Sequence, residues 1–355
     1  MAVHAIQAEK IFSYYGLETD PPSSLNGKVD NGLAQAQAVK SLIKSFLEDV
    51  GFDRDTPFIK DHDLEAAVWD YFKNLGMGED TEKSVQKVLK LSVTAYTSLP
   101  FDNKVTCATQ LLYMFLVDDI ADVFMEELRC FGQNKWCHFI KTHAFTLSNG
   151  HKHPLLSNFD THLRSLSRYY GPYCHSAIIK SLFDFANGCI VEQEMRQTGF
   201  KLPSESRLMP MFLRTKVGAA EILIHMLWPY SRFPEQTYMI QYFPVAQELA
   251  LFIDSTNDIL SHYKELVIND EKGNLVANFA DTHSMSQLDV LRHLTGYTPQ
   301  LINSVYSMLK NKEELLVTVK NFVDGCIMMC TAHRRYYLVE LFEDEQYLPP
   351  YDEDS

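Results

Sequence analysis

The chain has 355 residues, with 46 Asp and Glu against 32 Lys and Arg, which gives a formal net charge of −14. Apolar residues make up 46% of it, so the chain can bury a sizeable core and is too apolar to be disordered. The acidic balance argues against a nucleic-acid backbone or an anionic membrane as the main partner. A phosphorylated substrate fits this charge only if metal ions or a local cluster of Arg and Lys supply positive charge.

The two ends carry no sign of a targeting segment. No basic stretch followed by an apolar run opens the chain, and no stretch reaches the roughly 18–20 uninterrupted apolar residues that span a bilayer. The seven cysteines are scattered without a CxxC pair, which is typical of reduced thiols in the core of a cytoplasmic protein. We therefore expect a cytoplasmic protein without stable membrane insertion, with an irregular segment over 1–32 and an acidic tail over 346–355.

Between these ends, apolar residues recur at steps of three and four, which is the period of helices. The pattern predicts helices over 63–75, 88–96, 111–117, 178–195, 212–227, 245–266, 287–294, 299–309 and 313–342. Glycine and proline fall mostly between these segments. No Pro- or Ser-rich linker divides the chain, so we predict a single all-α domain over residues 1–355, built as a helical bundle.

The first candidate metal site follows the apolar helix over 111–117. Asp118 and Asp122 are four positions apart and share one face of a helix, whereas Asp119 points about 100° away. Two carboxylates one turn apart repel each other unless a cation lies between them, and Mg²⁺ prefers such hard oxygen ligands. A solvated acidic helix end explains these three residues equally well.

The second candidate metal site lies on the helix predicted over 245–266. Asn257, Ser261 and Glu265 follow one another at intervals of four, which puts amide, hydroxyl and carboxylate oxygens on one stripe of the helix. The alternative is an ordinary amphipathic helix with a polar stripe. Asn and Ser are poor choices for the middle of a surface helix, so the metal site is favoured.

Two acidic metal sites in one helical domain need an anion to bridge them. The candidates to bind that anion are Arg214, Lys264, Arg334, Arg335 and Tyr336. Arg214 lies in a mostly apolar helix, where it needs a partner, and a diphosphate that accepts bidentate guanidinium bonds is a suitable one. The alternatives are that Arg214 reaches the surface or pairs with a carboxylate, and that Arg335 only complements a helix dipole.

These motifs, in this order and spacing, resemble the class I terpene cyclases, and within them the fungal trichodiene synthase-like sesquiterpene cyclases. The matching positions are Asp118, Asp119 and Asp122 for the aspartate-rich motif, Asn257, Ser261 and Glu265 for the NSE motif, Arg214 for the pyrophosphate sensor, and Arg335 with Tyr336 for the late Arg-Tyr pair. The similarity covers about residues 60–345. His333 stands where trichodiene synthase has an acidic residue, which weakens trichodiene as the product.

The resemblance implies a class I terpene synthase helical bundle with a central active-site cavity and three Mg²⁺ ions. Asp118 would ligate two ions with Asp122 as a helper, and Asn257, Ser261 and Glu265 would hold the third. The residues implied to bind the diphosphate are Arg214, Lys264, Arg335 and Tyr336. The residues implied to be catalytic are Asp118, Arg214, Gly218, Arg335 and Tyr336, where a helix break at Val217 and Gly218 would aim a carbonyl dipole at the forming cation.

Aromatic rings can stabilise such a cation without reacting with it. Phe115, Phe185, Trp228 and Phe252 lie near the motifs and are pocket candidates, although core packing is the better default for each.

We therefore expect a magnesium-dependent carbon–oxygen lyase of isoprenoid secondary metabolism. It would ionise an isoprenyl diphosphate, expected to be farnesyl diphosphate, and cyclise the carbocation to a C15 hydrocarbon or alcohol. The alternatives are a diterpene cyclase acting on geranylgeranyl diphosphate, a chain-elongating prenyltransferase, which would need a second Asp-rich motif, and a non-enzymatic helical interaction protein. The sequence leaves open whether two copies form a homodimer.

Overall fold

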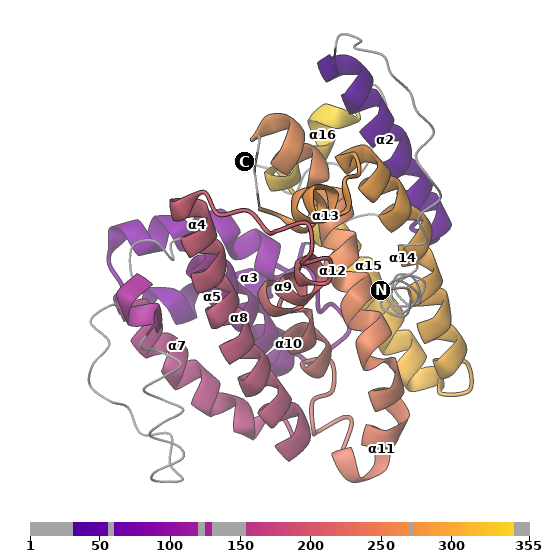
Figure 1. The fold of residues 1–355 in the computed structure, drawn as a ribbon. Coiled ribbons are helices and arrows are strands. Elements are labelled where there is room, and N and C mark those ends of the chain that lie inside the picture. The colour runs from indigo at the N-terminus through magenta and orange to yellow at the C-terminus, as the bar shows by residue number, and fades with distance from the viewer. Residues whose placement is uncertain are drawn as a thin grey trace.

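The computed structural model describes residues 31–55, 60–119, 125–129, 154–269, 271 and 273–343, and these contain helices and no β-strand (Figure 1). The all-α prediction is confirmed. The elements are α2 (Asn31–Asp49), α3 (His62–Lys73), α4 (Glu79–Ser92), α5 (Phe101–Asp119), α7 (Pro154–Ser165), η2 (Leu166–Arg168), α8 (Pro172–Thr198), α9 (Met209–Val217), α10 (Ala220–His225), α11 (Glu235–Tyr242), η3 (Phe243–Val245), α12 (Ala246–His262), η4 (Tyr263–Ile268), α13 (Leu275–His283), α14 (Gln287–Leu309), α15 (Glu313–Thr331), η5 (Arg334–Tyr336) and α16 (Leu338–Leu341).

The helices surround α12. This helix packs against α10, α14 and α15, and it also touches α9 and α2. In Figure 1, α3, α4, α5, α7 and α8 form one side of the molecule, and α2, α13 and α14 form the other. Helices α9 and α10 lie between the two groups and pack on α8 and α12. Of the two sequence motifs, one therefore lies on α5, in the first group, and the other on the central α12.

One hydrophobic core cluster runs through the elements from α2 to α16. Helix α5 is buried on nearly every side from Asn103 to Val117, and its chain becomes exposed at Asp118 and Asp119. The acidic residues therefore stand where a buried helix reaches the surface, as the sequence predicts. No described helix combines the length with the apolar composition that a bilayer crossing requires.

Two predicted helix boundaries are wrong because of proline and glycine. The segments 287–294 and 299–309 are one continuous helix, α14, with Pro299 inside it. Pro299 is buried on the packed side of α14, so packing outweighs the loss of the backbone hydrogen bond that the proline ring prevents. The segment 212–227 is two helices, α9 and α10, because the chain breaks at Gly218 and Ala219, where Ala219 has a left-handed φ of 53°.

The helix predicted over 313–342 ends at Thr331. Two short helical turns follow, η5 and α16, and Tyr337 between them has a φ of 57°. Arg335 and Tyr336 therefore lie on a separate turn and not on the long helix. Of the irregular segment expected over 1–32, residues 31 and 32 already belong to α2, and the rest lies outside the described residues, as does the tail over 346–355.

Helix α15 packs directly on the backbone between α4 and α5. An ideal Cβ placed on Gly325 would come within 2.5 Å of the carbonyl oxygen of Ala95 and 3.0 Å of its Cα. Backbone atoms cannot move aside as a side chain can, so glycine is required at this crossing.

We expect Gly325→Ala to destabilise the protein by about 1–3 kcal/mol, the usual cost of overpacking a close contact. Gly296→Ala is the matched control, because Gly296 lies within α14 and no atom of a neighbouring element lies within 4 Å of the place that its methyl group would take. Ala is the better helix former, so the control should be neutral or stabilising by up to about 1 kcal/mol. Denaturant unfolding measures both, and equal effects would contradict the close crossing.

Candidate active site

Arg214 on α9 is held by α12. Its Nε donates to Asp258 Oδ2 at 2.8 Å, and its Nη2 donates to the main-chain oxygen of Asp254 at 3.0 Å and to Asn257 Oδ1 at 3.3 Å. Burial alone would lower the pKa of Arg214, but Asp258 and Asp254 outweigh it and raise the pKa. The alternative that Arg214 pairs with carboxylates is therefore confirmed, and diphosphate binding stays a prediction.

The two carboxylates that hold Arg214 have raised pKa values. Burial raises the pKa of Asp254 to about 7 and that of Asp258 to about 6, although the Arg214 guanidinium lowers both. Asp254 belongs to neither predicted motif, so sequence reasoning missed it. The signal available in the sequence is a lone carboxylate within the apolar run that precedes Asn257.

Asn257 and Ser261 of the NSE motif lie in the C-terminal part of α12, and Glu265 lies just beyond it on η4. Asn257 donates from Nδ2 to the Tyr336 hydroxyl at 3.2 Å. Ser261 is buried, and its Oγ has no hydrogen-bond partner among the described residues. A buried hydroxyl without a partner is rare in proteins, which makes it a candidate ligand for something that binds there.

Glu265 does not continue the regular α-helical stripe. The chain becomes a π-helix at Tyr263, so Glu265 lies in a wider turn than predicted. Its Oε2 accepts a hydrogen bond from Asn274 Nδ2 at 3.0 Å, and its Oε1 is 3.4 Å from Lys264 Nζ. Single π-helical turns occur often at functional sites.

Asp118 and Asp119 at the end of α5 have different surroundings. Asp119 forms a bidentate pair with Arg335, at 2.7 and 3.1 Å. Asp118 makes no ion pair among the described residues. Desolvation by the surrounding protein, followed by repulsion from Asp119, raises the pKa of Asp118. Asp122 lies outside the described residues.

The turn that carries Arg335 and Tyr336 is fixed from several sides. His333, which begins the turn, is buried, and its Nε2 lies 3.1 Å from Thr94 Oγ1. Tyr336 is buried, and the ammonium of Lys264 lies 5.9 Å from the centre of its ring. The pairs to Asp119 and Asn257 therefore join this turn to α5 and α12, which brings the four predicted diphosphate ligands to one place.

Glu192 on α8 also lies near Asp118 and Arg214 in the candidate active site, and the sequence motifs did not predict it. Burial, and then the charge of Asp118, raises the pKa of Glu192 to about 7, while Arg214 and Arg196 lower it. The sequence signal is its spacing, because Glu192 follows the buried Phe185 by two helical turns on the same side of α8.

The four pocket candidates occupy different environments. Phe115 is half-buried at the rim, with the guanidinium carbon of Arg335 5.9 Å from its ring centre. Phe185 and Phe252 are buried on α8 and α12. Trp228 stacks on Tyr242, with ring centres 4.8 Å apart, inside an aromatic core cluster. A pocket role for each ring stays a prediction.

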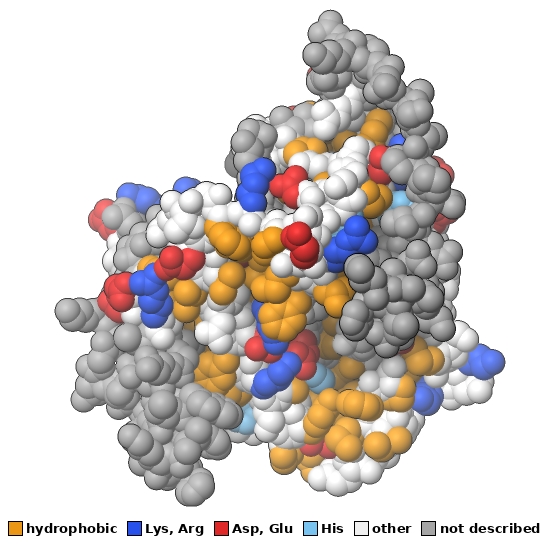
Figure 2. Space-filling view, viewed as in Figure 1, with side chains coloured by type: hydrophobic (Ala, Val, Ile, Leu, Met, Phe, Trp, Pro, Cys, Tyr) orange, Lys and Arg blue, Asp and Glu red, His pale blue; other side chains and the backbone are white. Residues whose placement is uncertain are grey.

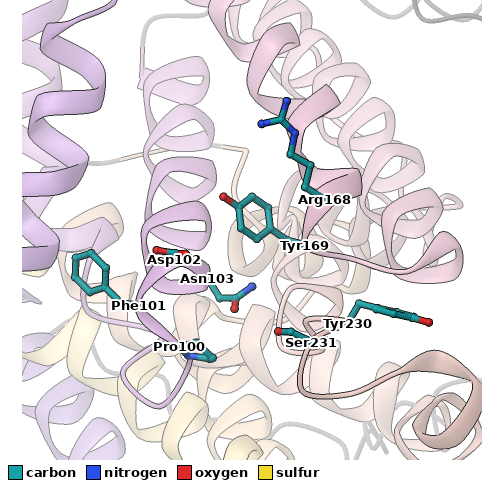
Figure 3. Close-up of a pocket in the computed structure, with 8 residues that line it drawn as sticks. All are labelled: Pro100, Phe101, Asp102, Asn103, Arg168, Tyr169, Tyr230 and Ser231. Atoms are coloured by element: carbon teal, nitrogen blue, oxygen red, sulfur yellow. The ribbon is translucent and has the colours of Figure 1, made fainter.

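A cavity of about 490 Å³ lies elsewhere, at the N-terminal end of α5 (Figure 3). Its lining residues are Pro100, Phe101, Asp102, Asn103, Arg168, Tyr169, Tyr230 and Ser231. None of the predicted site residues is among them. Because Phe101 and Asp118 are at opposite ends of α5, about 26 Å of helix separates this cavity from the candidate active site.

The trichodiene synthase family model matches residues 79–349, from α4 to beyond α16. The chain belongs to this family. The matched span contains every predicted metal- and diphosphate-binding residue, and the resemblance to trichodiene synthase-like cyclases is confirmed.

Individual relatives are distant. Trichodiene synthase of Fusarium pseudograminearum is 24% identical over 264 residues, which cover 74% of this chain and 66% of that protein. Monoterpene synthase 25 of Postia placenta is 27% identical over 305 residues, which cover 85% and 86%. The chain spans only 50% of the length of trichodiene synthase of Gibberella zeae.

Solved structures share the helical fold. Linalool/nerolidol synthase from Streptomyces clavuligerus in complex with 2-fluorogeranyl diphosphate has a TM-score of 0.58 at 13% identity, with 78% of this chain and 96% of that chain covered. Hedycaryol synthase in complex with nerolidol has a TM-score of 0.55 at 13% identity, with 77% and 94% covered. At this identity the similarity shows the fold alone.

We expect wild-type stability, relative to that of Glu192→Gln, to fall as the pH rises from about 4.5 to about 7. The pKa of Glu192 is raised from 4.5 to about 7 in the folded protein. The stabilising proton is fully bound below the unfolded pKa and is lost as the pH rises through the folded pKa. Denaturant unfolding of both proteins with chelator at pH 4.5 and 8 measures the difference. Asp254 and Asp258 titrate in both proteins, so their effect cancels in the comparison. A difference in unfolding free energy that does not vary with pH would contradict a raised pKa of Glu192.

Proposed function

We propose that the protein is a sesquiterpene synthase that ionises farnesyl diphosphate with the help of Mg²⁺ and cyclises the allylic cation to a C15 hydrocarbon or alcohol. The observation that carries the proposal is the convergence of Arg214, Lys264, Arg335 and Tyr336 on the polar side chains of α5, α12 and η4. Family membership supports the reaction class. The relatives include one named (E)-beta farnesene synthase and one named monoterpene synthase, which makes the C10 diphosphate the natural competitor to test beside farnesyl diphosphate.

The donor set fits Mg²⁺. Ser261 contributes a buried oxygen without a hydrogen-bond partner in the described part of the chain. The Asn257 amide precedes it on α12, and the Glu265 carboxylate follows it on η4. Among the described residues no three His, Cys, Asp or Glu side chains cluster, and Asp122 lies outside these residues. Asn257, Ser261 and Glu265 would hold one ion, and Asp118, with Asp122, would hold two others. Bound Mg²⁺ neutralises the diphosphate charge and so stabilises it as a leaving group.

The protein's own residues bind and orient the diphosphate. Three of the candidate ligands already have polar partners: Arg214 donates to Asp258, Arg335 donates to Asp119, and the Tyr336 hydroxyl accepts from the Asn257 Nδ2 group. These pairs hold the donors in place before substrate arrives, and donors fixed in advance stabilise developing charge more effectively than mobile ones.

The helix break after Arg214 supplies a second electrostatic element. The last carbonyl groups of a helix have no intrahelical partners and carry partial negative charge. The last carbonyl groups of α9, which ends at Val217, lie beside α12 and α8, whereas the Ala219 carbonyl accepts from the Ile222 and Leu223 amides of α10. We infer that the last carbonyl groups of α9 face the carbocation, while the surrounding apolar core excludes water from it.

Incubation with farnesyl diphosphate and Mg²⁺ should give a volatile C15 product in gas chromatography–mass spectrometry, with the C10 and C20 diphosphates tested in parallel. Asn257→Ala should reduce turnover by about 100-fold or more, as losses of fixed polar groups at charged transition states do. Asn303→Ala, at an exposed position of α14, is the matched control and should keep full activity. Absence of product from all three diphosphates would refute the proposal.

We expect Ser261→Ala to leave the stability of the metal-free protein unchanged, because the Ser261 hydroxyl makes no hydrogen bond among the described residues. The Mg²⁺ concentration for half-maximal turnover should rise. Ser92→Ala is the control, because the buried Ser92 hydroxyl donates to the Leu89 carbonyl at 2.7 Å, and its loss should cost about 1 kcal/mol without changing the Mg²⁺ dependence. Equal Mg²⁺ dependence in wild type and Ser261→Ala would remove Ser261 from the metal site.

A further inference from the structure

The turn that carries Arg335 and Tyr336 is too short to hold its own position. It follows the end of α15, and η5 contains only three residues, Arg334–Tyr336. Within it the Tyr336 amide donates to the His333 carbonyl at 3.2 Å. A single 3₁₀ turn is not stable by itself, so contacts with the rest of the protein must fix its place.

The side-chain contacts of Arg335 and Tyr336 lead into the candidate active site. Arg335 donates to Asp119, and Tyr336 accepts from Asn257. The proposed function gives both side chains to the diphosphate, so both contacts are open to rearrangement when the anion binds. An anchor that keeps the turn in place during binding therefore has to lie at another residue.

His333 supplies such an anchor where the turn begins. The backbone leaves α15 here in an extended conformation, with a φ of −114° and a ψ of 134°. The imidazole is 4% exposed, and its Nε2 lies 3.1 Å from Oγ1 of Thr94, which is 3% exposed. The contact joins the turn to the segment between α4 and α5, outside the predicted metal and diphosphate sites.

A neighbouring hydrogen bond sets the direction of this contact. The Thr94 hydroxyl has one proton, which it donates to the Lys90 carbonyl at 3.0 Å. Thr94 Oγ1 is therefore the acceptor toward His333, and the hydrogen-bond network assigns the proton of the imidazole to Nε2. A carboxylate could not donate in this way, which gives a physical reason for histidine at the position where the sequence departs from trichodiene synthase.

The segment that carries Thr94 is a rigid support. The backbone of the next residue, Ala95, lies against α15, where an ideal Cβ on Gly325 would be 2.5 Å from the Ala95 carbonyl oxygen. The buried Tyr96 hydroxyl donates to the Leu223 carbonyl of α10 at 2.9 Å. Thr94 is therefore a fixed point between α4, α10 and α15, and the turn takes its position from it.

Enclosure makes this contact stronger than a polar contact at the surface. Acidic and basic side chains lie side by side in the middle of the face in Figure 2, over α9 and α10, where water screens their attraction. His333 and Thr94 are both buried, and a buried donor that loses its acceptor cannot turn to water instead. The loss of either partner should therefore displace the turn.

We propose that His333 is a positioning residue whose hydrogen bond to Thr94 fixes the turn that carries Arg335 and Tyr336. The bond holds these two side chains at the mouth of the site while their own contacts change. The consequence for diphosphate binding rests on the proposed function, which assigns Arg335 and Tyr336 to that anion.

Thr94→Val removes the acceptor and keeps the shape of the side chain. We expect the amides of residues 333–342 to exchange hydrogen about 5- to 100-fold faster in the metal-free protein, the factor that an unpartnered buried donor costs. The affinity for inorganic pyrophosphate in the presence of Mg²⁺ should fall by about 3- to 10-fold, because the turn must first return to its place. Hydrogen-exchange mass spectrometry and calorimetric titration measure the two effects.

Three further variants separate this contact from a general loss of stability. His333→Leu removes the donor and should act as Thr94→Val does, whereas Thr94→Ser keeps the acceptor and should stay close to wild type. Thr318→Val is the matched control, because the buried Thr318 hydroxyl also donates to a carbonyl four residues earlier, that of Glu314, at 2.8 Å. Thr318 lies about 20 Å of helix before the end of α15, so its loss should change neither measurement.

Wild-type exchange rates over residues 333–342 in Thr94→Val and His333→Leu would overturn the proposal. Faster exchange with unchanged pyrophosphate affinity would also overturn it, because the position of the turn would then not matter to the anion. A wild-type protein that does not bind pyrophosphate with Mg²⁺ would refute the proposed function instead, while the exchange rates would still decide whether His333 fixes the turn.

Discussion

A guanidinium buried against two carboxylates is the interaction on which the rest of this site depends. Arg214 joins α9 to α12 through Asp258 and Asp254, and neither the cation nor the carboxylates would be stable there alone. The same two side chains, Arg214 and Asp254, lie directly against Gly218 at the helix break. Contacts of α9 and α10 with α8 and α12 accompany this ion-pair network.

A second network closes the site from the opposite side. Asp119 binds Arg335, and Tyr336 accepts from Asn257, so the turn after α15 is joined both to α5 and to α12. The net charge of −14 is reflected in this site, where acidic side chains surround the basic ones. Acidic and amide oxygens hold the basic side chains in place, and metal ions would reverse the sign of the site and make an acidic protein a diphosphate binder.

Helical periodicity predicted α3, α8 and α12, whose apolar residues recur at helical steps. It found only residues 111–117 of α5, which is buried on nearly every side. It failed where tertiary packing overrides local rules, as at Pro299 inside α14 and at the end of α15. The motif residues were found because their spacing repeats on one helix. Glu192 and Asp254 were missed, since each is a single carboxylate whose meaning comes from helices distant in sequence, and only the fold shows what they face.

The most direct test of this account is calorimetric titration of the wild-type protein with inorganic pyrophosphate, with and without Mg²⁺. The arrangement of paired donors predicts binding that requires Mg²⁺, because without it the acidic side chains keep their hold on Arg214 and Arg335 and repel the anion. Equal affinity with and without Mg²⁺, or no binding in either case, would contradict the account.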